Sequence, residues 1–250
     1  MIQKIIILSF LAAALLSNNP SFGQSADFKS VEIPGKNGIS IQGDLYQLEK
    51  TDKPFVLLFH QAGYSRGEYR ETAPWLNEMG FSCLAIDQRS GKKVNGVENE
   101  TFKQAKAKGL ETDYVSAMPD LRSAIDYVLN ELGQKEIILT GSSYSASLVF
   151  VLATEYPEKV KGVAAFSPGE YFKYNDKKIA IYAASVPCPV FVTSAAKEKK
   201  HWKPIYDAVK TEKTYYLPQS GGKHGSKALW SENDGYKAYR EAFKKFLTRF

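Results

Sequence analysis

Short apolar runs alternate with segments of helical character along most of the chain. Runs of strand length occur at residues 55–59, 81–86, 137–140, 160–166, 190–194 and 214–217. Residues 55–59 form a continuous apolar run, which is typical of a strand that is covered on both faces. Before them, residues 29–34 and 39–48 have the composition of two more strands, joined by a turn containing proline and glycine. The pattern therefore predicts eight strands.

Helices are predicted between the later strands. They cover about residues 68–79, 101–133, 146–155, 203–210 and 226–250. In the second helix, apolar residues from Tyr114 to Val128 recur at helical spacing and would face a sheet. The third is apolar on nearly all sides, which indicates burial, and Pro157 ends it. Strands that alternate with helices predict an α/β fold, with a mostly parallel eight-stranded sheet and helices on both faces.

The amino-terminal residues differ from the rest of the chain. Residues 5–16 form an apolar run of signal-peptide length, Lys4 is the only charge near it, and a polar break with small residues follows. We expect a signal peptide over residues 1–24, cleaved near residues 21–25, and one domain over residues 25–250; an uncleaved anchor is the alternative. The mature chain is then exported to the periplasm or beyond, and it has no other stretch long and apolar enough to span a bilayer.

Composition allows a large core and gives no sign of nucleic-acid binding. Of the 250 residues, 44% are hydrophobic, and the formal net charge is +6. Basic residues are scattered, with small clusters at residues 92–93, 177–178 and 197–200. No long basic run or nucleic-acid motif occurs, so a solvated surface is the better interpretation. Cys83 and Cys188 lie in apolar runs of strands that are not expected to be neighbours, which predicts two buried free thiols.

The turn after residues 137–140 carries a nucleophile motif. It reads Gly141-Ser142-Ser143-Tyr144-Ser145, a Gly-x-Ser-x-Gly pattern with serine in the last position. A serine on a sharp strand-to-helix turn exposes its hydroxyl beside the first amides of the helix, as acyl transfer requires. The register selects Ser143, because Ser145 would lie inside the helix. The alternative is that these serines only cap a buried helix.

Polar residues after the other predicted strands include partners for this serine. A serine hydroxyl needs an imidazole to accept its proton and a carboxylate to orient that imidazole. His224 lies in a Gly-rich loop after the last strand, and such a loop can return to the serine. His60 ends a strand beside an expected oxyanion loop and is expected to shape that loop. His201 opens a helix and fits a surface position.

The acidic partner is less well determined by the sequence. Glu198 lies four residues beyond the strand at residues 190–194, and neighbouring lysines would keep it ionised. The rival carboxylates are Asp207, Glu170 and Asp176. If Glu198 is the acid, the chain order is Ser143, then Glu198, then His224, and this serine–acid–histidine order is that of one known hydrolase arrangement.

The chain resembles the α/β-hydrolase superfamily, and within it the dienelactone-hydrolase-like serine hydrolases. The matching segments are residues 57–63, 85–91, 139–145, 189–198 and 223–225. The resemblance covers about residues 30–250 and implies the α/β-hydrolase fold. It also implies that the oxyanion is bound by the backbone N–H groups of Tyr144 and Ala62, with Gln61 as second choice for the latter.

Three features depart from the family pattern. Gln61 stands where glycine is common, the acid is glutamate where aspartate is more frequent, and the nucleophile is serine. Dienelactone hydrolases proper use cysteine, so the last departure argues against dienelactone as the substrate.

Aromatic residues near the predicted site suggest a substrate pocket. Residues 169–185 are the only sizeable excursion between strands, so any lid is small, and Tyr64, Tyr171 and Trp202 are candidate lining residues. No phosphate-binding loop, metal-ligand cluster or dinucleotide motif occurs, so we expect no cofactor and no metal. The sequence predicts an exported serine hydrolase that cleaves small to medium carboxylic esters through an acyl-enzyme. A prolyl-oligopeptidase-like amide or peptide hydrolase and a non-catalytic binding protein are the alternatives.

Overall fold

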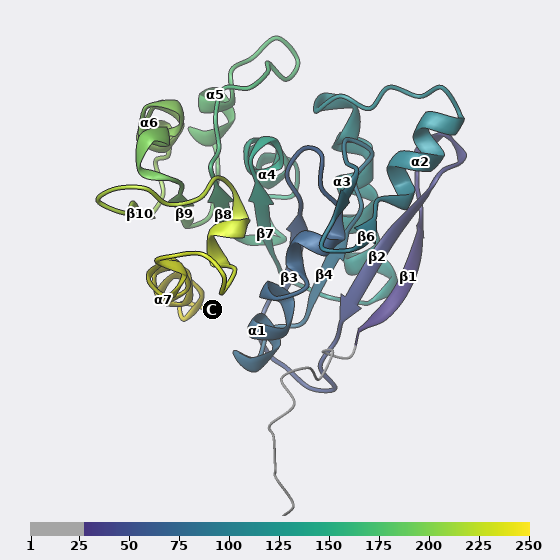
Figure 1. Cartoon of the computed structure of the whole chain (residues 1–250), viewed down its shortest axis with the longest axis horizontal. Coiled ribbons are helices and arrows are strands. Elements are labelled where there is room, and N and C mark those ends of the chain that lie inside the picture. The colour runs from purple at the N-terminus through teal and green to yellow at the C-terminus, as the bar shows by residue number, and fades with distance from the viewer. Residues whose placement is uncertain (1–27) are drawn as a thin grey trace, which may run out of the picture.

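The computed structural model describes residues 28–250, and one eight-stranded sheet runs through this part of the chain (Figure 1). Its order is β1-β2-β4-β3-β7-β8-β9-β10. The strands are β1 (Lys29–Pro34), β2 (Ser40–Tyr46), β3 (Phe55–Phe59), β4 (Cys83–Ile86), β7 (Ile137–Ser142), β8 (Val160–Phe166), β9 (Val190–Thr193) and β10 (Lys213–Tyr216). β2 pairs antiparallel with β1 and β4, and every later pair is parallel. The predicted mostly parallel sheet is confirmed.

Helices cover both faces of the sheet, as predicted (Figure 1). They are α1 (Thr72–Glu78), α2 (Glu100–Ala107), α3 (Met118–Asp126), α4 (Tyr144–Glu155), α5 (Ile179–Ala183), α6 (Lys199–Ala208) and α7 (Tyr236–Leu247). Side chains alternate along each strand, so Leu57 and Phe59 of β3 pack with α3 and α4, whereas Val56 and Leu58 face α1 and α7. All five residues of β3 are buried, which explains its continuous apolar sequence.

Two predicted helices are shorter than expected. The helix predicted over residues 101–133 is interrupted after α2, because Gly109 is left-handed (φ +66°) and the carboxylate of Asp113 caps a new turn by accepting the N–H groups of Val115 and Ser116. The helix predicted over residues 226–250 starts only at α7, after Gly235 (φ +80°). Glycine adopts this backbone region without the steric cost that other residues incur.

Two short elements were not expected. The loop at residues 87–99 contains a hairpin of β5 (Lys93–Val94) and β6 (Val97–Glu98), which turns at Asn95 and Gly96, both with positive φ. The excursion at residues 169–185 contains α5. The two segments follow the parallel strands β4 and β8, at the carboxyl ends of those strands.

The remaining expectations concern the thiols and the amino terminus. Cys83 and Cys188 are buried free thiols. Cys83 lies in β4 and Cys188 just before β9, and three strands of the sheet, β3, β7 and β8, separate β4 from β9. The predicted signal peptide, residues 1–24, lies outside the described residues. Within residues 28–250, no helix has the length and apolar character that crossing a membrane requires.

Candidate active site

Ser143 occupies a sharp turn between β7 and α4. Its backbone has φ 60° and ψ −119°, a conformation that non-glycine residues rarely adopt and that is often found at functional sites. A Cβ atom on Gly141 would lie 2.5 Å from the carbonyl oxygen of Ser145, so the start of α4 approaches the strand too closely for a side chain there. The turn therefore presents Ser143 at the carboxyl end of the sheet.

Ser145 explains how serine replaces the usual last glycine of the motif. Its side chain is fully buried, and its hydroxyl oxygen accepts the N–H of Ser142 at 2.9 Å. The same oxygen lies 2.7 Å from the carbonyl oxygen of Phe59 at the end of β3. The hydroxyl thus fastens the turn to the neighbouring strand.

Three predicted residues meet in one line. Nε2 of His224 lies 2.8 Å from Oγ of Ser143, and Nδ1 of His224 lies 2.7 Å from Oε1 of Glu198. This pairing fits an imidazole with its proton on Nδ1, which leaves Nε2 free to accept the serine proton. The arrangement has the geometry of a nucleophile, a base and an orienting acid.

Glu198 is held on its other oxygen as well. Oε2 accepts the hydroxyl of Ser167 at 2.7 Å and the N–H of Ala195 at 3.2 Å. Partial burial by itself would raise the pKa of Glu198, but hydrogen bonds from His224 and Ser167 outweigh it and lower the pKa below its ordinary value. The oxygen of Ser167 also accepts the N–H of Gly225, next to His224. One serine thus links the acid to the histidine loop.

Among the described residues, none of the rival residues takes part in the hydrogen bonds of His224. The carboxylate of Glu170 accepts the N–H groups of Ile179 and Ala180 at the start of α5. Asp207 pairs with Lys203 on the exposed side of α6, and Asp176 lies in an exposed turn. His201 is exposed on α6, whereas His60 is buried beneath the loop after β3.

The two preferred oxyanion donors have unoccupied N–H groups. Among residues 28–250, the backbone N–H groups of Ala62 and Tyr144 donate to no protein acceptor. The N–H of Gln61 instead donates to a carboxylate oxygen of Glu68 at 2.7 Å. Gln61 is therefore wrong as the second-choice donor, because its amide is already used.

His60 fixes the orientation of the Ala62 amide. Nε2 of His60 accepts the N–H of Gln88 at 2.8 Å, so its proton lies on Nδ1, which donates to the carbonyl of Gln61 at 2.8 Å. In a trans peptide the C=O and N–H groups point in opposite directions, so the Ala62 N–H points away from His60. Burial lowers the pKa of His60 to about 4, which keeps the ring neutral.

Gln88 was not singled out from the sequence, yet it joins both halves of this site. Its Oε1 accepts the N–H of His60 at 2.7 Å, and its Nε2 donates to the hydroxyl of Tyr144 at 2.6 Å. The end of β3 and the start of α4 are thereby tied through the end of β4. Its position directly after a buried strand was the only sequence signal for such a role.

Of the candidate pocket residues, only Tyr171 lines the depression beside the triad. This depression has a volume of about 370 Å³ and also borders His224 and Glu198. Trp202 is wrong as a pocket residue, because the apolar face of α6 packs it into the core, where its Nε1 donates to Ser194. Tyr64 stacks on Trp230, with ring centroids 6.3 Å apart, and is not among the lining residues.

Basic side chains lie on one side of the three aligned residues, and aromatic rings lie on the other. Lys197, Lys200 and His201 line the depression beside His224, and among residues 28–250 neither lysine forms an ion pair. Such side chains favour an acidic group on a ligand. On the side of the helix start, the partly exposed ring of Tyr114 stacks on Tyr144, with centroids 4.8 Å apart.

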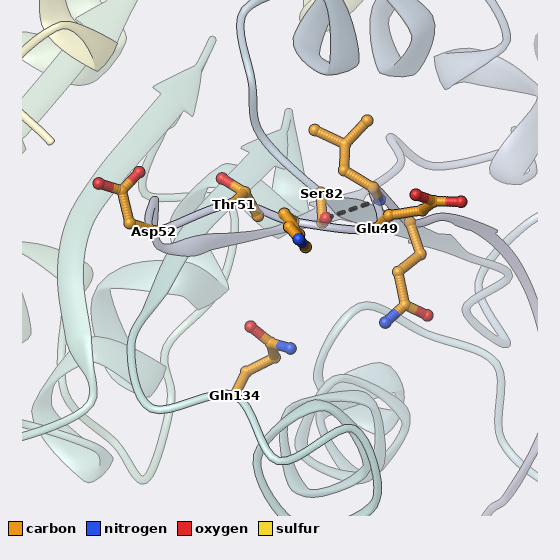
Figure 2. Close-up of a pocket in the computed structure, with 8 residues that line it drawn as sticks. Glu49, Thr51, Asp52, Ser82 and Gln134 are labelled. Carbon is orange, nitrogen blue, oxygen red and sulfur yellow. Dashed lines mark hydrogen bonds between the residues drawn. The ribbon is translucent and has the colours of Figure 1, made fainter.

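A larger depression, about 620 Å³, lies at the opposite end of the strands, and Figure 2 shows the residues that line it. Ser82 and Gln134, which line it, precede β4 and β7, so it borders the amino ends of the parallel strands. Open parallel sheets bind ligands at the carboxyl ends. Volume alone therefore does not select a candidate site, whereas the hydrogen-bonded side chains of Ser143, His224 and Glu198 do.

Fold and geometry together define an α/β-hydrolase. The family model of the S33 serine aminopeptidases matches residues 50–217, and the chain belongs to that family of hydrolases. Among curated proteins, none matches the chain.

Solved structures share the fold at low sequence identity. A dienelactone hydrolase from Anabaena variabilis superimposes with a TM-score of 0.71 at 16% identity, covering 90% of this chain and 99% of that one. An esterase from Pyrococcus furiosus gives 0.69 at 18% identity, with 90% and 93% covered. An acylaminoacyl peptidase gives 0.65 at 15% identity, but only 41% of that chain is covered. The predicted α/β-hydrolase resemblance is confirmed.

Proposed function

We propose that this hydrolase cleaves carboxylic esters of small to medium size through a covalent acyl-enzyme. The observation that supports it most directly is the continuous line from the Ser143 hydroxyl through His224 to Glu198, with contacts of 2.8 and 2.7 Å. A hydroxyl aligned in this way can transfer its proton as it attacks a carbonyl carbon. The reaction needs no cofactor.

Each residue has one task in the proposed reaction. Oγ of Ser143 attacks the ester carbonyl carbon while its proton passes to Nε2 of His224, and Glu198 holds the resulting imidazolium through Nδ1–H. The N–H groups of Ala62 and Tyr144 bind the oxyanion of the tetrahedral intermediate. His224 then returns the proton to the departing alkoxide. A water molecule repeats the sequence, releasing the carboxylic acid and restoring the serine.

Hydrolysis of an amide or peptide bond is the second candidate, and the family match to serine aminopeptidases favours it. The same residues would act, but the nitrogen leaving group is poorer than an alkoxide and needs closer positioning of the proton donor. The open depression beside His224 favours the ester, because in the described part of the chain Tyr171 is the only residue of the excursion at 169–185 that lines it.

A matched pair of substrates distinguishes ester hydrolysis from amide hydrolysis. With the p-nitrophenyl ester and the p-nitroanilide of one acyl group, we expect kcat/KM to favour the ester by at least about 100-fold, or about 2.7 kcal/mol. An anilide with a free α-amino group tests aminopeptidase activity in the same assay. Comparable or faster hydrolysis of either anilide would move the assignment to a peptidase, and Ser143→Ala controls for a contaminating enzyme.

We also propose that the protein is exported, on the strength of residues 1–24. Expressed at full length in a bacterium, the chain is expected to accumulate outside the cytoplasm, with an amino terminus near residue 25 by mass spectrometry. A full-length chain that stays in the cytoplasmic or membrane fraction would contradict cleavage and export.

A further inference from the structure

A fully buried carboxylate lies behind the proposed catalytic residues. Glu68 belongs to a 3-10 turn, Arg66–Tyr69, after β3 and is completely inaccessible to solvent. Among residues 28–250 it forms no ion pair with a basic side chain. An isolated buried charge is costly unless hydrogen bonds satisfy it, so its surroundings explain its presence.

Four hydrogen bonds reach this carboxylate from three separate segments. Oε2 accepts the backbone N–H of Gln61 at 2.7 Å. Oε1 accepts the hydroxyl of Ser142 at 2.7 Å, the hydroxyl of Ser226 at 2.6 Å and the side-chain amide of Gln61 at 3.2 Å. The segments are the loop after β3, the end of β7 and the loop after β10.

Each partner adjoins a residue of the proposed machinery. Gln61 precedes the oxyanion donor Ala62, and Ser142 precedes the nucleophile. Ser226 follows the histidine by two residues. The carboxylate therefore touches the neighbours of the oxyanion donor, the nucleophile and the base without touching substrate.

The hydrogen-bond directions fit an ionised group. The hydroxyl oxygen of Ser142 accepts the N–H of Ser226 at 2.9 Å, so its own proton is free to go to Glu68. The N–H groups of Gln61 can only donate, and the hydroxyls of Ser142 and Ser226 can donate as well, so an ionised carboxylate accepts all four bonds. Burial raises the pKa of Glu68 above its ordinary value, and the hydrogen bonds from Ser226, Gln61 and Ser142 offset part of that rise.

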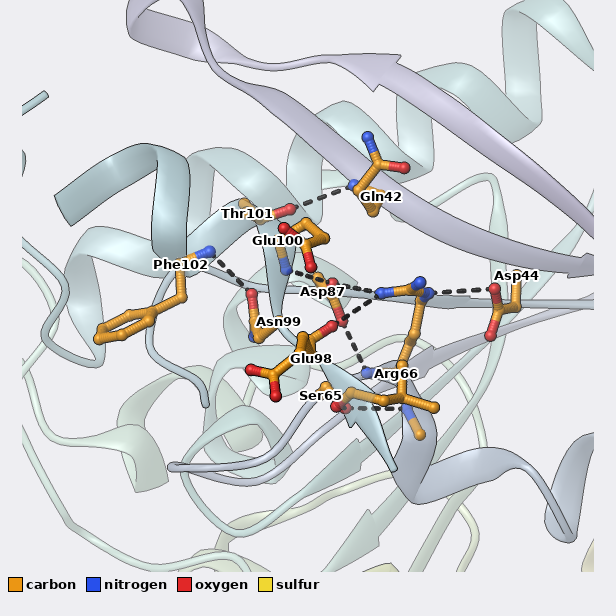
Figure 3. Close-up of polar contacts among 12 residues, drawn as sticks. Gln42, Asp44, Ser65, Arg66, Asp87, Glu98, Asn99, Glu100, Thr101 and Phe102 are labelled. Carbon is orange, nitrogen blue, oxygen red and sulfur yellow. Dashed lines mark hydrogen bonds and ion pairs between the residues drawn. The ribbon is translucent and has the colours of Figure 1, made fainter. Parts of the chain in front are cut away.

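The turn that carries Glu68 is itself anchored to the sheet (Figure 3). Nε of Arg66 lies 3.0 Å from the carboxylate of Asp44 on β2, and Nη1 of Arg66 lies 2.6 Å from the carboxylate of Asp87 after β4. The backbone N–H of Arg66 also donates to Asp87 at 2.8 Å. The carboxylate of Glu68 is therefore presented from a fixed position.

Close packing leaves the histidine loop little freedom. Gly225 has φ 72°, and a Cβ atom there would lie 2.5 Å from Oγ of Ser142 and 3.2 Å from Nε2 of Gln61. Both of those atoms are partners of Glu68. The loop can approach the end of β7 only because position 225 is glycine.

We propose that Glu68 is a positioning residue. Its ionised side chain holds the oxyanion loop, the nucleophile turn and the histidine loop in fixed positions relative to one another. The inference rests on the proposed serine-hydrolase function. Misplacing catalytic groups by about 1 Å can cost 100-fold in rate. Removing this acceptor therefore lowers the rate of the chemical step more than it weakens substrate binding.

Glu68→Gln tests the proposal, because it keeps the shape and replaces one acceptor oxygen by an amide donor. We expect kcat on a p-nitrophenyl ester to fall about 10- to 100-fold, with KM changed less than about twofold. Labelling of Ser143 by a fluorophosphonate should slow in parallel. Ile41→Ala, a buried truncation in β2, is the control for lost stability and should leave kcat per folded molecule unchanged.

A double-mutant cycle with Ser226→Ala separates positioning from general destabilisation. If Glu68 acts by holding Ser226, the double variant should lose little more activity than Glu68→Gln alone. Full additivity, or a normal kcat in folded Glu68→Gln, would overturn the inference while leaving the hydrolase assignment intact. A wild-type protein that neither labels nor hydrolyses esters would instead defeat the proposed function itself.

Discussion

Replacing Ser143 by alanine is expected to lower kcat for ester hydrolysis by on the order of 10⁵- to 10⁶-fold. The substitution removes the hydroxyl oxygen that lies 2.8 Å from Nε2 of His224, so no covalent intermediate can form. The fold should tolerate it, because Ser143 is only half-buried and its neighbours Gly141 and Ser145 maintain the turn. Steady-state kinetics on a p-nitrophenyl ester measures the loss.

Covalent labelling gives the same test a second readout. A fluorophosphonate should modify the wild-type protein at Ser143 and leave Ser143→Ala unmodified, with peptide mass spectrometry locating the adduct. Ser220→Ala, at an exposed position, is the matched control and should label normally. Serine-independent labelling, or none in a folded wild-type protein, would favour a non-catalytic binding protein with this fold.

The sheet was predictable because its strands are buried on both faces. β3 is an uninterrupted apolar run and β7 begins with one, and such runs are typical of parallel strands between two layers of helices. Helix ends were less predictable. The break after α2 depends on a left-handed glycine and on the cap made by Asp113, neither of which interrupts the apolar pattern of the segment.

The triad could be predicted for a related reason. In a parallel sheet, residues that follow different strands meet at one edge, so Ser143, Glu198 and His224 were found by position as much as by type. The prediction for Trp202 was wrong because a tryptophan close to the acid in the sequence is a plausible pocket residue. Its position on α6 instead directs the side chain into the core.

Glu68 and Gln88 had no comparable signal. The partners of Glu68 include Ser226, 158 positions away, and the contact arises only when three loops have been placed. Gln88 likewise connects His60 to the hydroxyl of Tyr144 across two strands. Supporting residues of this kind are specified by tertiary packing, and short sequence patterns do not contain them.

Replacing Glu198 by glutamine is expected to reduce kcat about 10⁴-fold. The amide keeps the size of the side chain, but it can present N–H to Nδ1 of His224 and thereby favour the wrong tautomer for accepting the serine proton. It also removes the negative charge that stabilises the imidazolium formed during attack. The lowered pKa of Glu198, which follows from its bonds to His224 and Ser167 despite partial burial, indicates that the ionised form is the one held there.

Two further variants test whether the effect depends on the charge and position of Glu198. Glu198→Asp keeps the charge and shortens the reach, so it should retain far more activity than Glu198→Gln at equal stability. Asp207→Asn, on the exposed side of α6, should leave kcat near the wild-type value because that carboxylate pairs with Lys203. A near-normal rate for Glu198→Gln would mean that the imidazole works without this acid. The hydrogen bond of 2.7 Å would then be a feature of folding rather than of catalysis.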